Sequence, residues 1–126
     1  MGRGVALSLA LAGCRVILID TSSKILESAW KDLTDQARMQ RMFRKDPELP
    51  STEVLLSRIQ LTLDYELLQD VDFVIENVTE SWESKEEVYQ KIDTICHKQC
   101  LFAVNTSTIP ISHIAELTSR PPLVIG

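Results

Sequence analysis

Short apolar runs that alternate with helix-like segments constrain the fold of this chain more than any other feature. Val16-Ile17-Leu18-Ile19 is a run of consecutive apolar residues, mostly β-branched, that ends at Asp20. A run of this kind predicts a strand that is buried on both faces, as in parallel sheets covered by helices. Further strands are expected at 59–63, 71–78, 101–105 and 123–126.

Apolar residues at helical spacing fill the segments between these strands. Val5, Leu9 and Ala12 recur along one side of a helix, and Gly13 follows in the position where helices commonly stop. The other helices are expected at 23–44, 51–58, 83–97 and 110–118. Because strand and helix alternate without a tight hairpin signal, we expect an α/β fold with a parallel sheet and helices on both faces.

Charge and hydropathy exclude several classes of protein. The chain has 126 residues, which suit one domain or a piece of one, and 13 basic against 18 acidic side chains give a net charge of −5. Such an acidic chain is not expected to bind nucleic acid through bulk charge. No apolar run approaches the roughly 18 residues that span a bilayer, and the N-terminus lacks the features of a signal peptide. We therefore expect a cytoplasmic protein that binds neither nucleic acid nor membrane.

The three cysteines form no recognisable disulfide or metal framework. Cys96 and Cys100 flank His97, but no second pair of ligands occurs anywhere in the chain, and Cys14 stands apart. A structural zinc site needs four ligands at characteristic spacings. We therefore expect no metal site, and reduced thiols of the kind found in cytoplasmic proteins.

Gly2 and Asp20 form the first candidate constellation. A helix that begins at Gly2 presents unpaired N–H groups and the positive end of its dipole, both of which favour an anion. Asp20 ends the next strand, and in a dinucleotide-binding βαβ unit an acid there accepts hydrogen bonds from ribose hydroxyls. Its charge would also favour NAD over NADP. The alternative is a closely packed helix start with an acid that faces water.

Asn105, Thr106 and Ser107 form the second constellation, directly after a predicted buried strand. Ligands of open parallel sheets bind beyond the carboxyl ends of the strands, where amide and hydroxyl groups can orient a carbonyl or an alcohol. None of the three side chains titrates near neutrality, so none can be the general base. The alternative is a cap for the next helix.

A third group of polar side chains follows the strand expected at 71–78. Glu76 is unusual because it lies within a hydrophobic strand, where an unpaired carboxylate would be costly. Asn77, Glu80 and Lys85 come shortly after it. For Glu80 and Lys85, an ordinary solvated position near the start of the next helix is the alternative interpretation.

Taken together, these pieces resemble the NAD-binding domain of 3-hydroxyacyl-CoA dehydrogenases over nearly the whole chain. The segments that carry the resemblance are Met1-Gly2-Arg3-Gly4-Val5-Ala6, Ile17-Leu18-Ile19-Asp20, Phe73-Val74-Ile75-Glu76-Asn77-Val78-Thr79-Glu80 with Lys85, Asn105-Thr106-Ser107-Thr108, and Pro121-Pro122-Leu123-Val124-Ile125-Gly126. The resemblance implies a Rossmann-type doubly wound parallel sheet with NAD as its cofactor.

The resemblance also implies roles for the cofactor-binding residues. Gly2 would be the third glycine of the phosphate loop, and Asp20 would bind the adenine ribose. Glu80 and Lys85 would lie along the cofactor, with Lys85 near the nicotinamide ribose. Asn77 would lie beside the cofactor, where the family usually has a small residue such as alanine.

For catalysis, the resemblance implies reversible hydride transfer between NAD and C3 of a 3-hydroxyacyl thioester. Ser107 would hydrogen-bond the 3-oxygen of the substrate, and Asn105 would support that site. The thioester would be an acyl-CoA or an acyl-carrier-protein conjugate. The run 77–80 is similar to a subgroup that acts on carrier-protein thioesters in secondary metabolism. A non-catalytic nucleotide-binding module remains the alternative from a different class.

Parts of the family's pattern are not found in this sequence. The first strand, the first two glycines, the catalytic histidine and the C-terminal helical domain have no counterpart, and neither His97 nor His113 matches that histidine. We therefore expect residues 1–126 to be a partial Rossmann domain of a longer, homodimeric protein. Loss of the base should cost a factor of about 10²–10⁴. We expect these residues alone to show no useful turnover and to bind NAD poorly.

Overall fold

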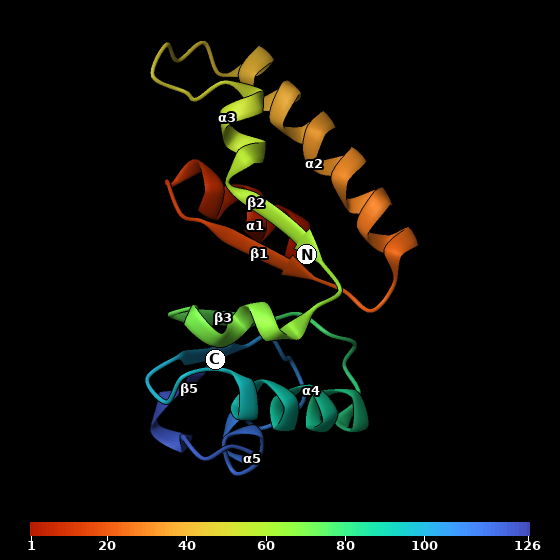
Figure 1. The fold of residues 1–126 in the computed structure, drawn as a ribbon, viewed down its shortest axis with the longest axis vertical. Helices are drawn as coiled ribbons and strands as arrows, with labels where there is room; N and C mark the ends of the chain where they lie inside the picture. Colours follow the sequence, from red (N-terminus) through yellow and green to blue (C-terminus); the bar gives the residue numbers. More distant parts are fainter. The chain divides into compact units, whose positions relative to one another are not determined.

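The computed structural model describes all residues from Met1 to Gly126 and divides them into two compact units (Figure 1). Unit 1 comprises Met1–Asp64 and unit 2 comprises Tyr65–Gly126. Each unit has its own sheet, β1–β2 in unit 1 and β3–β4–β5 in unit 2, and every strand pair is parallel. The predicted α/β architecture with parallel strands is confirmed, although the strands are distributed over two sheets rather than one. The prediction of one partial domain over residues 1–126 stays a prediction.

Unit 1 consists of three helices and two strands. In chain order they are α1 (Gly2–Leu11), β1 (Val16–Ile19), α2 (Ser23–Phe43), α3 (Thr52–Ser57) and β2 (Ile59–Thr62). The register of the sheet runs from Val16 opposite Ile59 to Ile19 opposite Thr62. The helices and strands lie within about two residues of their predicted ranges, and α1 begins at Gly2, where the sequence analysis placed the start of this helix.

Gly13 ends helix α1 as the sequence predicts. Its φ of +92° lies in the left-handed region that glycine adopts most readily. The N–H of Gly13 donates to the carbonyl of Ala10 (3.1 Å), and the N–H of Cys14 donates to that of Leu9 (2.9 Å). This pair of hydrogen bonds is a Schellman motif, which satisfies carbonyls at the helix end.

The core of unit 1 lies between the helices and one face of the sheet. It contains buried side chains from α1, α2, α3 and β2, namely Leu7, Ala10, Leu33, Ala37, Leu55, Leu56 and Ile59. Val16 and Leu18 of β1 pack against this core, whereas Ile17 and Ile19 alternate to the other face. All four are half-buried. The prediction of a strand buried on both faces is therefore wrong within unit 1.

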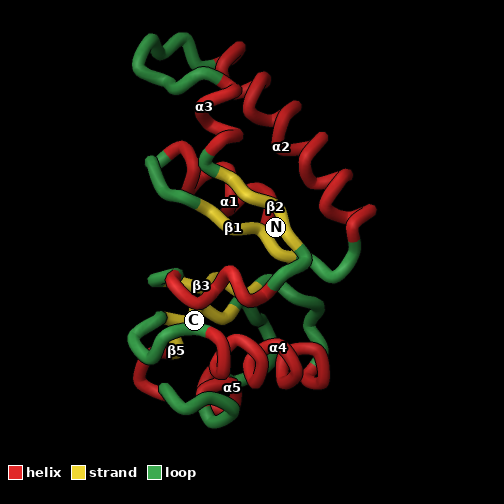
Figure 2. Tube along the Cα trace, viewed as in Figure 1, coloured by secondary structure: helices red, strands yellow, loops and turns green.

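Unit 2 has its three strands in the order β3–β4–β5, with α4 and α5 in contact with each other (Figure 2). The elements are the 3₁₀ helix η1 (Tyr65–Asp70), β3 (Phe73–Glu76), α4 (Trp82–Ile95), β4 (Leu101–Val104), α5 (Ile111–Ala115), the 3₁₀ helix η2 (Pro121–Leu123) and β5 (Val124–Ile125). Buried Tyr89 of α4 meets Phe102 of β4 edge to face, with ring centroids 6.0 Å apart. This pair anchors the long helix to the sheet.

Strand β3 is shorter than the predicted 71–78. It ends at Glu76, whose side chain forms a local hydrogen bond with the backbone that follows. The N–H of Val78 donates to the Glu76 carboxylate at 2.6 Å. A local bond of this kind competes with continuation of the sheet ladder. The loop 77–81 therefore starts directly after Glu76, and the Ser81 hydroxyl caps α4 by accepting from the N–H of Ser84.

Candidate functional site

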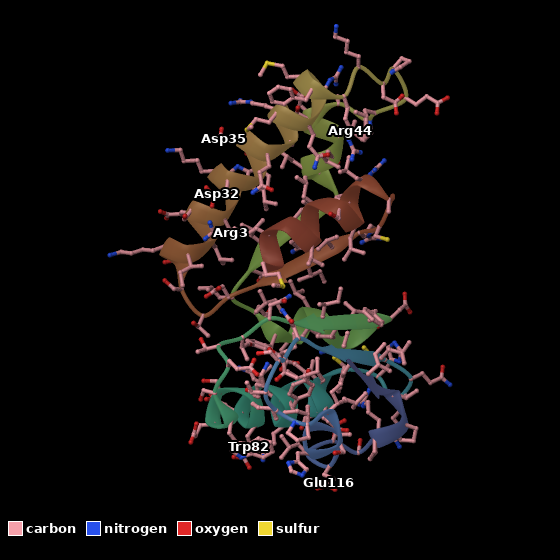
Figure 3. All side chains as sticks on the ribbon, turned by 180° about the vertical axis from the view of Figure 1, so that it is seen from behind. Arg3, Asp32, Asp35, Arg44, Trp82 and Glu116 are labelled. Carbon is pink, nitrogen blue, oxygen red and sulfur yellow. The ribbon has the colours of Figure 1, made fainter.

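The start of α1 in unit 1 presents backbone N–H groups and no acidic side chain. The first α-helical hydrogen bond runs from the N–H of Val5 to the carbonyl of Met1, and no side chain caps the helix. The N–H groups of the first helical turn, at Gly2 and its two successors, therefore have no partner within the helix. The Arg3 guanidinium forms a salt bridge with the Asp32 carboxylate of the neighbouring helix α2 (Figure 3). The helix end itself thus fits an anion such as a phosphate.

Asp20 directly follows β1, and only one of its two carboxylate oxygens accepts hydrogen bonds from the chain. Its Oδ1 accepts from the N–H groups of Thr21 (2.7 Å) and Ser22 (3.3 Å). Its Oδ2 accepts no hydrogen bond in the structure. A carboxylate fixed in this way keeps lone pairs for the hydroxyl groups of a ligand. The pair of Gly2 and Asp20 thus has the donors and acceptors that the phosphate and ribose of NAD require.

Lys85, in the first turn of α4, is the most buried charged residue of unit 2. Its Nζ donates to Glu76 Oε1 (3.0 Å), to Glu76 Oε2 (2.8 Å) and to the carbonyl of Asn105 (2.9 Å). An ammonium is unfavourable at a helix N-terminus, and the Glu76 carboxylate offsets that cost. Lys85 thereby ties the carboxyl end of β3 to that of β4. All three of its N–H groups are engaged within the chain, and its contact with a cofactor stays a prediction.

Two asparagines link the loops that follow β3 and β4. Asn105 Nδ2 donates to Asn77 Oδ1 at 2.8 Å, so the side chain at position 77, larger than the family's usual alanine, has a partner in the loop after the neighbouring strand. The backbone N–H of Asn105 also donates to the carbonyl of Glu76 (3.2 Å) and extends the ladder by one bond. Asn77 and Asn105 therefore lie together at the edge where the sequence predicted a site.

Glu80 contacts the residues that follow β4 through a single carboxylate oxygen. Its Oε1 accepts from both threonine hydroxyls, of Thr106 and of Thr108 (2.8 Å), and from the N–H groups of Ser107 and Thr108 (3.2 Å each). Its Oε2 lies 3.9 Å from Lys85 Nζ. The hydrogen bonds from Thr106 and Thr108 lower the pKa of Glu80 to about 2, so this carboxylate is ionised at neutral pH.

The hydroxyl of Ser107 has no hydrogen-bond partner in the structure, although its N–H is engaged by Glu80. The side chain is exposed on the loop after β4. Among the predicted site residues, the structure brings together Asn77, Glu80, Lys85, Asn105 and Ser107 at the carboxyl ends of β3 and β4. Gly2 and Asp20 belong to unit 1, and their roles in binding the cofactor stay predictions.

The hydrogen bonds of the threonines on either side of Ser107 were not predicted from the sequence, although Thr106 belongs to the predicted triplet 105–107. Thr106 and Thr108 donate their hydroxyls to Glu80. The available signal was an acid in the loop after one strand and hydroxyl residues in the loop after the next. Because carboxyl ends of neighbouring parallel strands meet at one edge, such loops can contact each other.

The cysteines and the remaining acidic residues form no cluster of three or more groups able to hold a metal ion. Burial raises the pKa of the Cys96 thiol to about 12, and it also raises that of Cys100, whereas Cys14 is exposed. No helix combines the length and the apolarity needed to cross a membrane.

Comparison with known proteins places this geometry in a family. The family model described as "3-hydroxyacyl-CoA dehydrogenase, NAD binding domain" matches residues 1–126. The probable 3-hydroxybutyryl-CoA dehydrogenase of Bacillus subtilis (strain 168) is 35% identical over 128 residues, and the peroxisomal bifunctional enzyme of Danio rerio is 32% identical over 126. Both matches include the whole of this chain, but only 44% of the first relative and 17% of the second.

Solved structures agree with the sequence comparison. The crystal structure of (S)-3-hydroxybutyryl-CoA dehydrogenase from Ralstonia eutropha matches with a TM-score of 0.90 and 29% identity, covering 98% of this chain and 44% of that one. The 3-hydroxybutyryl-CoA dehydrogenase of Escherichia coli K12 matches with a TM-score of 0.90 and 30% identity, covering 98% and 26% respectively. These matches confirm the Rossmann-type α/β fold and NAD as the cofactor of the family domain.

Proposed function

Because the chain belongs to the NAD-binding domain family of 3-hydroxyacyl-CoA dehydrogenases, we propose that it is the cofactor-binding part of an NAD-dependent oxidoreductase. The reaction is the reversible oxidation of a 3-hydroxyacyl thioester to the 3-oxoacyl thioester. The observation that carries this proposal is the loop after β4, where the Ser107 hydroxyl is unpartnered and its N–H is fixed.

The residues of unit 1 would hold the cofactor. The start of α1, at Gly2, suits the pyrophosphate, and the free Oδ2 of Asp20 suits the hydroxyls of the adenine ribose. NAD held by these residues would supply the acceptor for the hydride that leaves C3 of the substrate. The negative charge of Asp20 disfavours the additional phosphate of NADP, which supports NAD as the preferred form.

The residues of unit 2 would orient the substrate. The Ser107 hydroxyl donates to the 3-oxygen and stabilises the charge that develops there as hydride moves. Asn105 supports this position through its bond to Asn77. The loop supplies hydrogen-bonding groups and no side chain that titrates near neutrality, so it orients the substrate and does not take the proton.

The test uses the protein as its gene encodes it, with NADH and acetoacetyl-CoA, and follows absorbance at the reduced-nicotinamide band. We expect oxidation of NADH that depends on the thioester. A parallel reaction with acetoacetyl-carrier protein distinguishes the CoA enzyme from a carrier-linked dehydrogenase. Measurable NADH binding without turnover of either thioester would instead identify a non-catalytic nucleotide-binding module.

Assembly and location follow from the sequence-based expectations and stay predictions. We expect a homodimer, which sedimentation equilibrium would show as twice the mass of the encoded chain. We also expect a cytoplasmic location, which fluorescence microscopy of a tagged protein would test. An organellar pattern would contradict it.

A further inference from the structure

We propose that a hollow on the surface of unit 2, between α4 and α5, binds an arginine side chain from a basic segment of a partner protein. The hollow measures about 450 Å³ and is lined by Trp82, His113, Glu116 and Leu117. None of these residues belongs to the cofactor and substrate sites of the proposed function. The inference therefore goes beyond that function and does not depend on it.

The hollow combines an aromatic ring with carboxylates. Trp82 begins α4 and is 37% exposed. Glu86 lies one helical turn further along the same side of α4. Glu116, which directly follows α5, also lines the hollow (Figure 3). An indole ring attracts a cation to its face, and carboxylates accept hydrogen bonds from the N–H groups of that cation.

These groups have no cationic partner within the chain. Glu86 and Glu116 take part in none of the salt bridges of the structure. No lysine or arginine lies over the ring of Trp82. The acidic and imidazole groups also form no cluster that could hold a metal ion. The cation that fits the hollow is therefore an organic one from outside the chain.

Arg120 shows, in the same unit, how a ring and a carboxylate together hold a guanidinium. Its guanidinium carbon lies 4.8 Å from the centre of the Phe102 ring, and its Nε donates to Asp93 Oδ1 at 2.7 Å. The ring meets the face of the planar cation, and the carboxylate meets its edge. A lysine ammonium is a compact point charge without such a face. The hollow presents the same two kinds of group, so arginine is the side chain that suits it.

The charge of unit 2 favours a basic protein as the source of this arginine. Residues 65–126 contain ten acidic and four basic side chains, and two of the basic ones, Lys85 and Arg120, are buried in ion pairs. An acidic surface speeds the encounter with a basic segment. The residues that line the hollow are exposed or half-buried, so a side chain that projects from another protein can enter it.

The experiment uses saturation-transfer-difference NMR with the protein as its gene encodes it. The probe is a short, blocked alanine peptide with one central arginine. The same peptide with lysine, or with the neutral isostere citrulline, in the central position is the comparison. We expect saturable transfer to the δ-methylene protons of arginine, binding that is at least about threefold weaker for lysine, and no saturable binding for citrulline.

Two variants each remove one part of the site. Trp82→Leu keeps an apolar side chain without the ring face and should raise the dissociation constant of the arginine peptide by at least about threefold. Glu116→Gln removes one charge and should raise that constant by about twofold. Trp30→Leu on α2 and Glu87→Gln on α4 are the matched controls, because both residues are exposed and neither lines the hollow. Both controls should keep the wild-type dissociation constant.

Binding that is retained in both Trp82→Leu and Glu116→Gln would place the peptide elsewhere and overturn the proposal. Equal affinity for the arginine and lysine peptides would indicate attraction by bulk charge and would overturn it as well. Free arginine that binds as tightly as the peptide would identify a small-molecule site instead of a docking site for a protein. If circular dichroism shows that Trp82→Leu does not fold, Glu116→Gln decides.

The docking site and the proposed function are tested separately. The peptide titrations need neither NADH nor a thioester, so a failure of peptide binding leaves the proposed function intact. A protein that binds the arginine peptide but turns over no thioester would overturn the proposed function alone.

Discussion

Ser107 differs from its neighbours at the residue scale because its N–H is engaged and its hydroxyl is not. Under the proposed function this hydroxyl is a donor to the developing oxyanion. Removal of one such donor typically costs a factor of about 10²–10³ in kcat. Ser107→Ala should therefore lower kcat by roughly that factor and leave the affinity for NADH unchanged, as measured by steady-state kinetics and by fluorescence titration.

A matched serine provides the control for this prediction. Ser112 of α5 is exposed, and its hydroxyl has no hydrogen-bond partner in the structure. Ser112→Ala should keep the wild-type kcat. If Ser107→Ala also keeps it, Ser107 has no part in the reaction.

Asp20 supports a second prediction at this scale, which concerns the choice of cofactor. Only one of its two carboxylate oxygens accepts hydrogen bonds within the chain. The carboxylate should therefore accept hydrogen bonds from ribose hydroxyls and repel an additional phosphate. Asp20→Asn should therefore lower the ratio of kcat/KM for NADH over that for NADPH by about tenfold or more. The conversion Asp35→Asn, on the exposed side of α2, is the control and should keep the ratio. An unchanged ratio in Asp20→Asn would remove Asp20 from the cofactor site.

The sequence could indicate which polar residues lie together after β3 and β4, but not which hydrogen bonds join them. The sequence alone shows that the polar triplet 105–107 follows one apolar run and that Glu80 follows another. Their hydrogen bonds depend on which strands are neighbours and on side-chain rotamers. The sequence therefore placed Glu80 and Lys85 in a common site without showing that Glu80 binds the loop and that Lys85 is buried against Glu76.

At the scale of elements, the end of α1 depends on one backbone conformation. Gly13 has φ of +92°, and a Cβ built there would meet no atom within 4 Å. Gly13→Ala is therefore unfavourable through backbone strain and not through a clash. We expect it to lower the free energy of unfolding by about 1–2 kcal/mol, as measured by urea denaturation.

Gly4→Ala is the companion variant on the same helix. A Cβ at Gly4 also meets no atom within 4 Å, but the residue lies within α1 and has no positive φ. Alanine favours a helix over glycine by up to about 1 kcal/mol, so this variant should be neutral or stabilising. Equal destabilisation by both substitutions would show that the α1 sequence, and not the conformation of Gly13, determines the cost.

Element positions were predictable because periodicity and caps are local signals, and their ends were less so. The stop at Gly13 was found because its physical cause lies within five residues. The end of β3 was missed because the Glu76 carboxylate accepts from the N–H of Val78, which apolar periodicity does not encode. The spacing of apolar residues indicates which face of a helix or strand is buried, whereas local hydrogen bonds of polar side chains determine where the element ends.

At the scale of the whole molecule, the sequence predicted strand type but not strand neighbours. Alternation of helices and strands requires crossovers, and crossovers produce parallel pairs, which the structure shows in each unit. The division into a two-stranded and a three-stranded sheet is a property of pairing between distant segments. Because the apolar runs have similar compositions, their sequences do not indicate which strands will be hydrogen-bonded neighbours in a sheet.

The response to acid is a prediction for the whole molecule, because the carboxyl groups with lowered pKa all belong to unit 2. Hydrogen bonds lower the pKa of Glu80 to about 2 and also lower that of Glu83. The pKa of Asp93 is lowered as well: burial acts to raise it, but hydrogen bonds from Ser119 and Arg120 outweigh burial. A lowered native pKa means that the unfolded chain binds protons first as the pH falls.

The stabilising contribution of these groups is therefore complete above about pH 4.5 and decreases as the pH approaches 2. Hydrogen exchange followed by mass spectrometry should show that acidification from pH 5 to pH 2.5 lowers protection in residues 65–126 more than in residues 1–64. The double variant Glu80→Gln, Asp93→Asn should be less protected than wild type at pH 5 but should lose less protection on acidification, since the titrating groups are gone. An equal loss in wild type and variant would mean that these carboxylates do not couple the fold to pH.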